Sequence, residues 1–482
     1  MRQRRVVDRP RLRTLEQGVS ERHASWLELF FDLVFVLAVS QVAHVLSGHT
    51  DLGGFIKYTA LFVPIWYTWV GFTFYGDRFE TEETAFRVLI FAGMLSVTGL
   101  SLALGSAFTV TGDVPAVVCY ILVLGVLIAL YARAAYYVPL ARPYCRQYLM
   151  GLGFSVILFA VSLLFDAPLR YAIWAAAVGL QFAIPFINIR ATRLIPIDRS
   201  HIPERFGLFT IIVLGEAVIA AATGVANVAW GFTTIATATA GFAMAACIWW
   251  INFDFVEDNA IRSKSLTPRF VYLYGHFFIV ASIVAIGVGV EHAITESQMG
   301  HLALSTRALI SGGIAVYLAA ITVVRMVTGV CNLLYARVAS LAASLVFLYL
   351  GEFVMPLIFV SAQLLLLIGG IWVESRYGIE SEKEEDQSPH LVPCDHADQA
   401  TVFKARSEDG CEECRKNNYK WVHLRLCLGC GHVGCCDTSV HKHATKHYHA
   451  SGHAIMASLE AGENWAWCYT DERFVPLAKH VK

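Results

Sequence analysis

Residues 390–482 carry side chains that could bind a transition metal. They hold eight of the twelve cysteines and ten of the seventeen histidines. Two Cys-x-x-Cys pairs precede histidines spaced four and six residues apart, which is typical of tetrahedral zinc sites. A thioredoxin-like redox pair would need only one such pair within a βαβ pattern, which the surrounding sequence lacks. The candidate ligands are Cys394, His396, Cys411, Cys414, Cys427, Cys430, Cys435, Cys436, His443, His447, His453 and Cys468.

Carboxylates also occur inside apolar segments, where a charged side chain at a helix centre costs about 2.5–3.5 kcal/mol. Glu28 and Asp32 are four residues apart, so they lie on one face of a helix. Ser25-x-x-Glu28 matches a capping box, and helix initiation alone would explain Glu28. Asp32 lies one turn deeper, where capping cannot explain it.

Glu216 is expected near the middle of its apolar segment, about ten residues from the segment's start. Such an acid is either protonated or paired with a group on another helix, and His276 and Arg325 are the candidate partners. Asp254 and Glu352 lie near segment ends, so we expect them at the membrane interface. Intramembrane acids of this kind either hold helices together or lie on the path of an ion, proton or substrate, and both interpretations stay open.

The elements that must position these acids are long apolar helices. Hydrophobic residues make up 56% of the chain and charged residues only 16%, against a usual charged fraction of about 25%. A membrane-spanning helix needs about 20 mostly apolar residues. The sequence therefore predicts ten to twelve spans, with twelve segments at 25–46, 54–75, 87–110, 114–137, 147–165, 169–187, 206–227, 231–253, 270–291, 307–325, 331–350 and 353–373.

The distribution of arginine predicts the orientation of these spans. Lys and Arg accumulate in cytoplasmic loops, and the alternate loops that carry them include Arg78, Arg142, Arg190 and Lys264, whereas the intervening loops have almost none. We therefore expect a multi-pass protein of the inner membrane with both termini in the cytoplasm, where thiols stay reduced. Residues 1–24 are then a basic cytoplasmic tail. The net charge of −1 gives no indication of nucleic-acid binding.

The first and seventh spans both follow an Arg-bearing segment and carry acids, and the second and eighth both run through aromatic residues to an Asp. This similarity favours two six-helix halves. Trp26-Leu-Glu-Leu-Phe-Phe-Asp32, His201-Ile-Pro-Glu-Arg-Phe-Gly207, Phe253-Asp254 and Tyr274-Gly-His276 resemble the bacterial low-temperature-requirement A (LtrA) family over residues 20–375. The resemblance implies a multi-span membrane protein and supplies no substrate or reaction. We expect an all-α membrane domain at 25–373, an acidic linker at 374–391 and a small α+β zinc domain at 392–482.

The cysteine-rich segment resembles the ubiquitin-protease-type (UBP) zinc finger over residues 392–475. In the three-zinc form of that family the resemblance implies interleaved sites. The first would use Cys411, Cys414, Cys435 or Cys436, and His443, and the second Cys427, Cys430, His447 and His453. The third would use Cys394, His396 and Cys468 with Asp471, which stands where the family usually has Cys. Two to three zinc ions are expected.

The UBP resemblance also suggests a partner. Better-known family members bind the C-terminal Gly-Gly of ubiquitin with an arginine and aromatic side chains. Trp467 and Tyr469 match the aromatic residues, but Cys436-Asp437 stands where the arginine is expected. The ligand is therefore expected to be a protein C-terminus or a ubiquitin-like protein, with ubiquitin itself disfavoured.

Two functions fit the sequence. The first is a transporter or channel-like protein with a cytoplasmic zinc module for regulation or partner binding, in which Asp32, Glu216 and His276 couple transport. The second is a membrane scaffold or sensor whose spans anchor the zinc module. The spans contain no nucleophile or metallohydrolase motif, so we do not expect an enzyme.

Overall fold

The structure is a computed structural model of the 482-residue chain. It describes residues 10–12, 24–80, 83–109, 113–195, 201–254, 266–328 and 333–387, and, in the C-terminal part, 394, 396, 398, 400–407, 410–437, 439–460, 465–471 and 473–475. Most of the predicted basic tail, and the loop residues Arg199, Arg262 and Lys264, lie outside the described residues.

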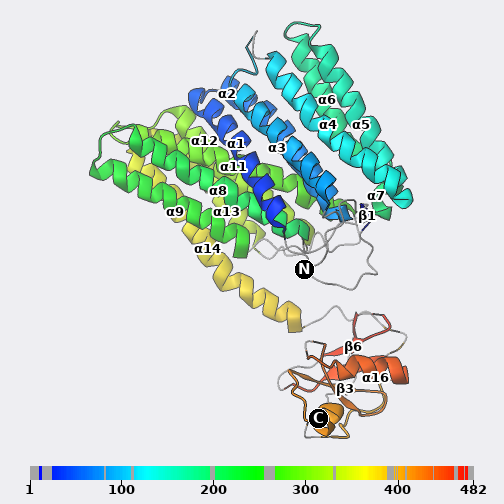
Figure 1. The fold of residues 1–482 in the computed structure, drawn as a ribbon. Coiled ribbons are helices and arrows are strands. Elements are labelled where there is room, and N and C mark those ends of the chain that lie inside the picture. Colours follow the sequence, from blue (N-terminus) through cyan, green and yellow to red (C-terminus); the bar gives the residue numbers. More distant parts are fainter. Residues whose placement is uncertain are drawn as a thin grey trace. The chain divides into compact units, whose positions relative to one another are not determined.

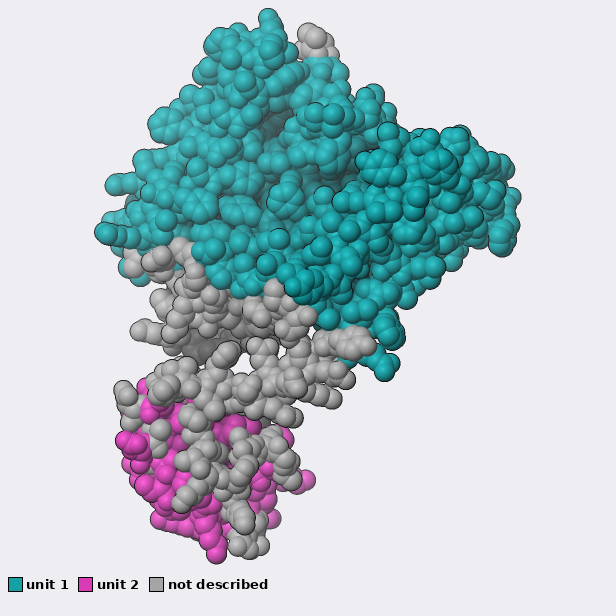
Figure 2. Space-filling model, turned by 180° about the vertical axis from the view of Figure 1, so that it is seen from behind, with its two compact units in different colours: residues 1–377 teal, residues 378–482 magenta. Residues whose placement is uncertain are grey.

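The chain divides into two compact units, residues 1–377 and residues 378–482 (Figure 2). Each unit has a hydrophobic core of its own. The core of the first is built from long helices, and that of the second from a small sheet and its loops. The two predicted kinds of domain are therefore both present.

The first unit is a bundle of long helices (Figure 1). Its described long helices are α1 (Trp26–Gly48), α2 (Leu52–Arg78), α3 (Thr84–Leu104), α4 (Asp113–Tyr137), α5 (Arg142–Ser162), α6 (Leu169–Ile187), α8 (His201–Ala226), α9 (Phe232–Asp254), α11 (Leu266–Thr295), α12 (Leu304–Thr328), α13 (Leu334–Leu350) and α14 (Pro356–Gln387). A short helix, α7 (Ile189–Leu194), follows α6. Each of the twelve predicted segments corresponds to one of these long helices.

Eleven helices in the described part of the chain are long and apolar enough to cross a membrane. The second predicted span corresponds to α2, which forms a helix of 27 residues but is not among the eleven. Its sequence mixes Lys57, three tyrosines and four glycines with the apolar residues. Nearly every residue from Ile65 to Arg78 is buried, so α2 packs against other helices along this stretch and needs less apolar surface than a lipid-facing span.

Helix contacts repeat between the two halves of the bundle. In the first half α1 contacts α2 and α3, α3 contacts α4, and α4 contacts α5; in the second, α8 contacts α9 and α11, α11 contacts α12, and α12 contacts α13. The Tyr120 hydroxyl of α4 donates to Gln181 of α6 and lies 3.5 Å from the carbonyl oxygen of Pro64 in α2, and Tyr317 of α12 donates to the carbonyl of Ile248 in α9. These equivalent contacts agree with the predicted six-helix halves, which meet where α1 contacts α8 and α11.

The helices begin and pack as their local sequences dictate. Ser25 and Glu28 form the predicted capping box at the start of α1. Small residues allow close helix contacts inside the bundle, as they commonly do in membranes. A Cβ atom added to Gly287 of α11 would lie 2.9 Å from the Cα of Ala217 in α8. Any larger residue at position 287 would therefore separate these two helices.

Helix α14 continues beyond the apolar segment to Gln387, through most of the segment expected as an acidic linker. That segment is rich in Glu and Lys, which favour helix. The change to polar residues near position 374 therefore marks the end of the apolar segment but not the end of the helix.

The second unit contains a five-stranded antiparallel sheet in the order β4-β3-β5-β6-β7. Its strands are β3 (Leu424–Cys427), β4 (Val433–Cys435), β5 (Ile455–Ser458), β6 (Ala466–Cys468) and β7 (Arg473–Val475). The helices are α15 (Glu412–Lys416) and α16 (His443–Ser451). Two further short strands, β1 (Arg11–Leu12) and β2 (Phe79–Glu80), pair in the first unit.

Candidate zinc centres and intramembrane sites

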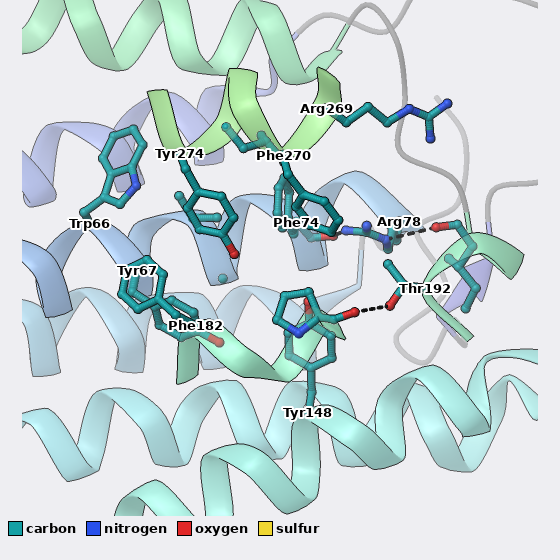
Figure 3. A pocket seen from close by; sticks show the side chains of 15 residues that line it. Trp66, Tyr67, Phe74, Arg78, Tyr148, Phe182, Thr192, Arg269, Phe270 and Tyr274 are labelled. Atoms are coloured by element: carbon teal, nitrogen blue, oxygen red, sulfur yellow. Dashed lines mark hydrogen bonds between the residues drawn. The ribbon is translucent and has the colours of Figure 1, made fainter. Parts of the chain in front are cut away.

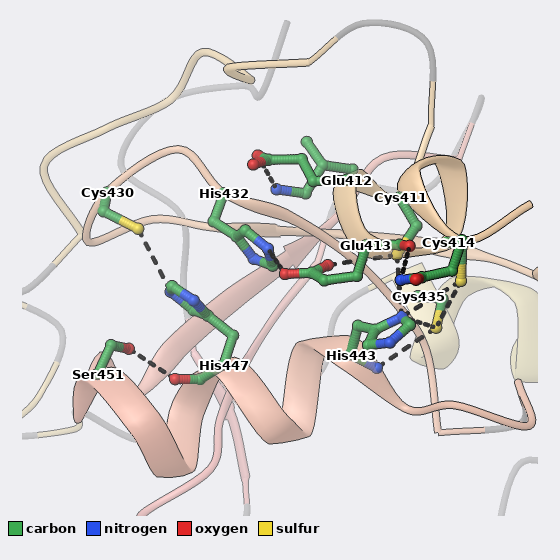
Figure 4. Close-up of polar contacts among 12 residues, drawn as sticks. Cys411, Glu412, Glu413, Cys414, Cys430, His432, Cys435, His443, His447 and Ser451 are labelled. Carbon is green, nitrogen blue, oxygen red and sulfur yellow. Dashed lines mark hydrogen bonds and ion pairs between the residues drawn. The ribbon is translucent and has the colours of Figure 1, made fainter.

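The ends of short elements in the second unit bring four candidate ligands together. Cys411 precedes α15, Cys414 lies in α15, Cys435 ends β4 and His443 begins α16 (Figure 4). His443 Nδ1 lies 3.3 Å from Cys411 Sγ, 3.2 Å from Cys414 Sγ and 3.4 Å from Cys435 Sγ. The sulfurs of Cys414 and Cys435 are 3.8 Å apart.

The sulfur–sulfur separation equals the edge of a zinc tetrahedron, and the nitrogen–sulfur separations are slightly shorter than its edges. With Zn–S bonds of about 2.3 Å and Zn–N bonds of about 2.0–2.1 Å, tetrahedral geometry places ligand atoms about 3.5–3.8 Å apart. Burial raises the pKa of the Cys414 thiol to about 12. A bound divalent cation would reverse this effect, since a coordinating thiol is deprotonated.

A second group contains Cys427, Cys430, His447 and His453, with all ligand atoms within 4.8 Å of one another. Cys427 ends β3, and His447 lies one turn after His443 on α16. The Nε2 atom of His447 is 3.3 Å from Cys430 Sγ. One helix thus supplies a histidine to each of the first two groups.

The third group combines Cys394, His396, Cys468 and Asp471. Asp471 Oδ2 lies 2.9 Å from Cys394 Sγ and 3.1 Å from His396 Nδ1. The carboxylate therefore lies where it could serve as the fourth ligand, as the resemblance to the UBP zinc finger predicted. Burial raises the pKa of the Cys394 thiol to about 11.

The structure distinguishes between the adjacent cysteines. Cys435 belongs to the first group, whereas Cys436 Sγ lies 3.4 Å from the hydroxyl of Ser439. His432 was not expected to ligate, and its ring stacks on that of His447 with centroids 4.1 Å apart while its Nε2 lies 2.7 Å from Glu413 Oε1. This contact would orient the His447 ring.

The two residues expected to bind a partner lie in β6 and directly after it. Trp467 of β6 packs edge-on against Phe474, and Tyr469 stacks on Tyr448 of α16. The Tyr469 hydroxyl is 3.5 Å from Asp437 Oδ2. An acid therefore stands beside the aromatic residue, where a carboxylate ligand would need a positive charge.

In the first unit, Glu28 and Asp32 face a complementary pair on another helix. His201 and Arg205 of α8 have the same four-residue spacing as the two acids of α1. Arg205 Nη2 donates to Asp32 Oδ1 at 2.6 Å, and Arg205 Nη1 lies 3.6 Å from Glu28 Oε1. His201 Nε2 is 3.4 Å from the same Glu28 oxygen.

Helix α2 adds two more side chains to this group. Trp69 Nε1 donates to Asp32 Oδ1 at 2.8 Å, and His201 Nδ1 is 3.0 Å from Asp77 Oδ1. All of these side chains except Glu28 are almost fully buried. We call Glu28, Asp32, Trp69, Asp77, His201 and Arg205 the charged cluster. It joins α1, α2 and α8 at the contact between the two halves.

Of the charged cluster, the sequence identified only Glu28 and Asp32 of α1 as candidate site residues. It placed Arg205 in a loop, since the seventh span was expected to begin at residue 206, whereas α8 begins at His201. The matching i, i+4 spacing of Glu28–Asp32 and His201–Arg205 was the signal that could have identified the histidine and arginine.

The remaining intramembrane candidates are separated from the charged cluster. Glu216 lies beside Ser40 and His44 of α1 and Glu291 of α11. Its two expected partners have other contacts. His276 is buried and its Nδ1 lies 2.7 Å from the carbonyl of Tyr272, while Arg325 pairs with Glu374. Asp254 is exposed at the last position of α9, and Glu352 is exposed and lies 3.5 Å from Arg307. Their place at the membrane interface stays a prediction.

Two cavities lie along α2 and α6, toward opposite ends of the bundle. The larger, about 740 Å³, is lined by the first half of α2 and by α6 from Tyr171 to Phe182, together with α3, α4 and α5. The smaller, about 60 Å³, is lined by the second halves of α2 and α6 with Tyr148 of α5 and the start of α11 (Figure 3). Phe182 of α6 lines both cavities. We call the smaller one the basic-end cavity, because Arg78 and Arg269 line it.

Known proteins resemble both units. The profile of the bacterial low temperature requirement A protein (LtrA) family matches residues 23–373, and that of the Zn-finger in ubiquitin-hydrolases and other protein matches residues 411–479. The Rhizobium meliloti (strain 1021) protein named Uncharacterized protein RA0937 is 27% identical over 304 residues, which cover 59% of this chain and 73% of that protein. The solution structure of protein RPA1320 from Rhodopseudomonas palustris is 42% identical and covers 19% of this chain and 96% of its own, with a TM-score of 0.17.

The helical bundle, the buried polar residues of α1 and α8 and the Cys/His groups thus agree with the family matches. The clustered cysteines and histidines indicate zinc binding. The chain belongs to the bacterial low temperature requirement A (LtrA) family and is a multi-pass membrane protein with a C-terminal zinc-finger domain of the type found in ubiquitin hydrolases.

Proposed function

We propose that this protein is a membrane transporter whose solute path runs along α2 and α6. The observation that carries the proposal is the pair of cavities that meet at Phe182. The Phe182 ring packs against Tyr67 of α2 at 5.3 Å and Tyr274 of α11 at 5.7 Å between ring centroids. These three rings close the path between a large cavity at one end and a nearly collapsed cavity at the other.

This arrangement is what alternating access requires, namely one cavity open while the other is closed. Movement of α6 would exchange the two states, and α6 contains Gly179 and Pro185, which line different cavities. A proline inside a helix removes a backbone hydrogen bond and permits bending. The charged cluster would hold α1, α2 and α8 together as the fixed part during this movement.

The arginines at the ends of α2, α5 and α11 support an orientation in which the basic-end cavity faces the cytoplasm. Both termini would then be cytoplasmic, in the inner membrane. The second unit would hold three zinc ions, one in each group of four ligands, and act as a regulatory or partner-binding module. Asp437 beside Tyr469 disfavours a free carboxylate, such as the ubiquitin tail, as its ligand.

The transport proposal can be tested without knowing the solute. Vesicles containing the purified protein are loaded with a bacterial cytosolic extract, and the released solutes are identified by mass spectrometry. Gly179 lines the larger cavity and has open space where a side chain would begin, so Gly179→Phe should fill the path. Gly125 of α4 also has open space but lines neither cavity, so Gly125→Phe is the matched control.

We expect at least one solute to leave vesicles that contain the unmodified protein or Gly125→Phe, and to be retained by those with Gly179→Phe. Release that does not differ from protein-free vesicles would contradict transport. It would favour the alternative, a scaffold that anchors the zinc module, which is consistent with the second unit having a core of its own.

A further inference from the structure

The residues that line the two cavities carry charge of one sign. Among the described lining residues, the charged side chains are Arg78 and Arg269, both in the basic-end cavity. The acids of the charged cluster line neither cavity. A solute on this path would therefore meet positive charge and no carboxylate, which favours an anion over a cation.

Arg78 is the more informative of the two arginines. It is 5% exposed, and its guanidinium lies over the rings of Phe74 and Tyr144 at 5.0 and 4.9 Å. Its hydrogen-bond acceptors are the carbonyl oxygens of Ile195 and Phe74, each at 3.3 Å. Among the described residues no carboxylate forms an ion pair with it: the adjacent Asp77 acts on Arg78 through its charge, but its Oδ1 contacts His201 Nδ1 at 3.0 Å. A buried cation without a directly paired carboxylate is costly, and a ligand anion would reduce that cost.

The other residues that line the two cavities favour a ligand whose body, apart from its charged group, is apolar. Trp66, Tyr67, Phe74, Tyr148, Phe182 and Tyr274 surround the basic-end cavity (Figure 3), and the larger cavity is lined almost wholly by apolar side chains. Aromatic and aliphatic walls with few fixed polar groups bind ligands with an apolar body. A small hydrophilic anion would gain little from such walls.

We propose that this path takes organic monocarboxylates with an apolar body and that Arg78 binds the carboxylate. The larger cavity has the volume to hold the body, since small-molecule sites span about 300–1,000 Å³. The basic-end cavity, at about 60 Å³, is too small for the body, so a ligand with its carboxylate at Arg78 extends its body into the larger cavity only when the Tyr67, Phe182 and Tyr274 rings move apart. Transport of such acids rests on the proposed function, whereas their binding does not.

Binding is measured by calorimetry on the purified full-length protein in detergent. The probes are 3-phenylpropanoate and decanoate, each with its neutral amide as a control of the same shape. We expect the acids to bind at least about ten-fold more tightly than their amides, because a charge-assisted guanidinium–carboxylate contact is lost in the amide. Tighter binding of 3-phenylpropanoate would identify aromatic acids as the ligand class, and tighter binding of decanoate would identify fatty acids.

Arg78→Gln should weaken acid binding about ten-fold, and Arg78→Lys should retain part of it. Arg142→Gln is the control, since Arg142 is exposed at the same end of the bundle and lines neither cavity. Equal binding of acids and amides in the unmodified protein would overturn the proposal even if the Arg78 variants do not fold. So would the absence of binding by both acids, or undiminished binding by a folded Arg78→Gln protein.

The two proposals can fail separately. Acid binding that depends on Arg78, without flux in the vesicle assay, supports this inference and contradicts transport. Flux of other solutes that is blocked by Gly179→Phe, without acid binding, supports transport and overturns this inference.

Discussion

Asp32 receives hydrogen bonds from side chains on two other helices, Trp69 of α2 and Arg205 of α8. The spacing of Glu28 and Asp32 showed that they share a helix face, and the capping box explained Glu28. The matching spacing of His201 and Arg205 pointed to a complementary pair, but it could not show that α1 and α8 meet, because packing among twelve similar apolar segments decides which helices are neighbours. Glu216 illustrates the same limit, since both residues expected to pair with it have other contacts.

Replacing Asp32 by Asn should destabilise the bundle. The amide can still accept from Trp69, but Arg205 loses its ionised partner in a buried position. Removing one member of a buried ion pair costs about 3–5 kcal/mol, so the thermal unfolding midpoint of the first unit in detergent should fall clearly. Asp166→Asn is the control, because Asp166 is fully exposed and 4.0 Å from Arg170. The midpoint of this variant should not change.

An Asp32→Asn midpoint equal to that of the unmodified protein would show that the charged cluster does not stabilise the bundle.

The adjacent cysteines Cys435 and Cys436 provide a matched pair of variants. Cys435 Sγ lies with the ligand atoms of Cys411, Cys414 and His443, and Cys436 Sγ faces Ser439. We expect Cys435→Ser to lose about one zinc ion per chain and Cys436→Ser to lose none, measured by elemental analysis of the purified proteins. The opposite result would mean that the register of β4 is shifted by one residue.

The zinc ligands were the most predictable of the candidate site residues, because short elements bring them together. The Cys-x-x-Cys pairs and the four-residue spacing of His443 and His447 are local, and α16 places its two histidines in different groups. The family resemblance was needed to interleave the groups along the chain. The choice between Cys435 and Cys436 required the strand register, in which Cys435 pairs with Leu424.

Helix α16 is held close to strand β4 at Gly434. A Cβ atom added there would lie 2.5 Å from the backbone nitrogen of Ala444 and 2.8 Å from its Cα. Gly434→Ala should therefore displace α16 with His443 and His447 and weaken the first two zinc groups, leaving the third intact. Competition with a chromogenic chelator should show two ions released more readily and one unchanged.

A substitution at Gly452, at the other end of α16, is the control for Gly434→Ala. Gly452 ends α16 at φ +73° with no atom near an added Cβ, and asparagine tolerates that conformation. Gly452→Asn should therefore release zinc as the unmodified protein does. Uniform weakening of all three ions in Gly434→Ala would indicate general unfolding of the domain and contradict the specific role of α16.

At the scale of the whole molecule, composition predicted the division into a membrane part and a zinc part, and twelve apolar segments predicted twelve long helices. The sequence did not predict that α2 would be a largely buried helix rich in aromatic residues. It also did not predict that the two cavities would follow α2 and α6. Such features arise from contacts between helices that are distant in the sequence, and the periodicity of a single segment carries no information about them.

The two units have separate cores, and we expect only the second to depend on bound zinc for its folding. Its core contains few aliphatic side chains, and structural zinc contributes apparent free energies of about 10–16 kcal/mol to small domains. A strong chelator should therefore unfold residues 394–475 while the helices of the first unit stay folded. Hydrogen exchange followed by mass spectrometry should show protection lost in β3–β7 and α16 and retained in α1–α6, with recovery when zinc is restored. Loss of protection in α1–α6 at the same chelator concentration would show instead that the bundle depends on the zinc domain for its stability.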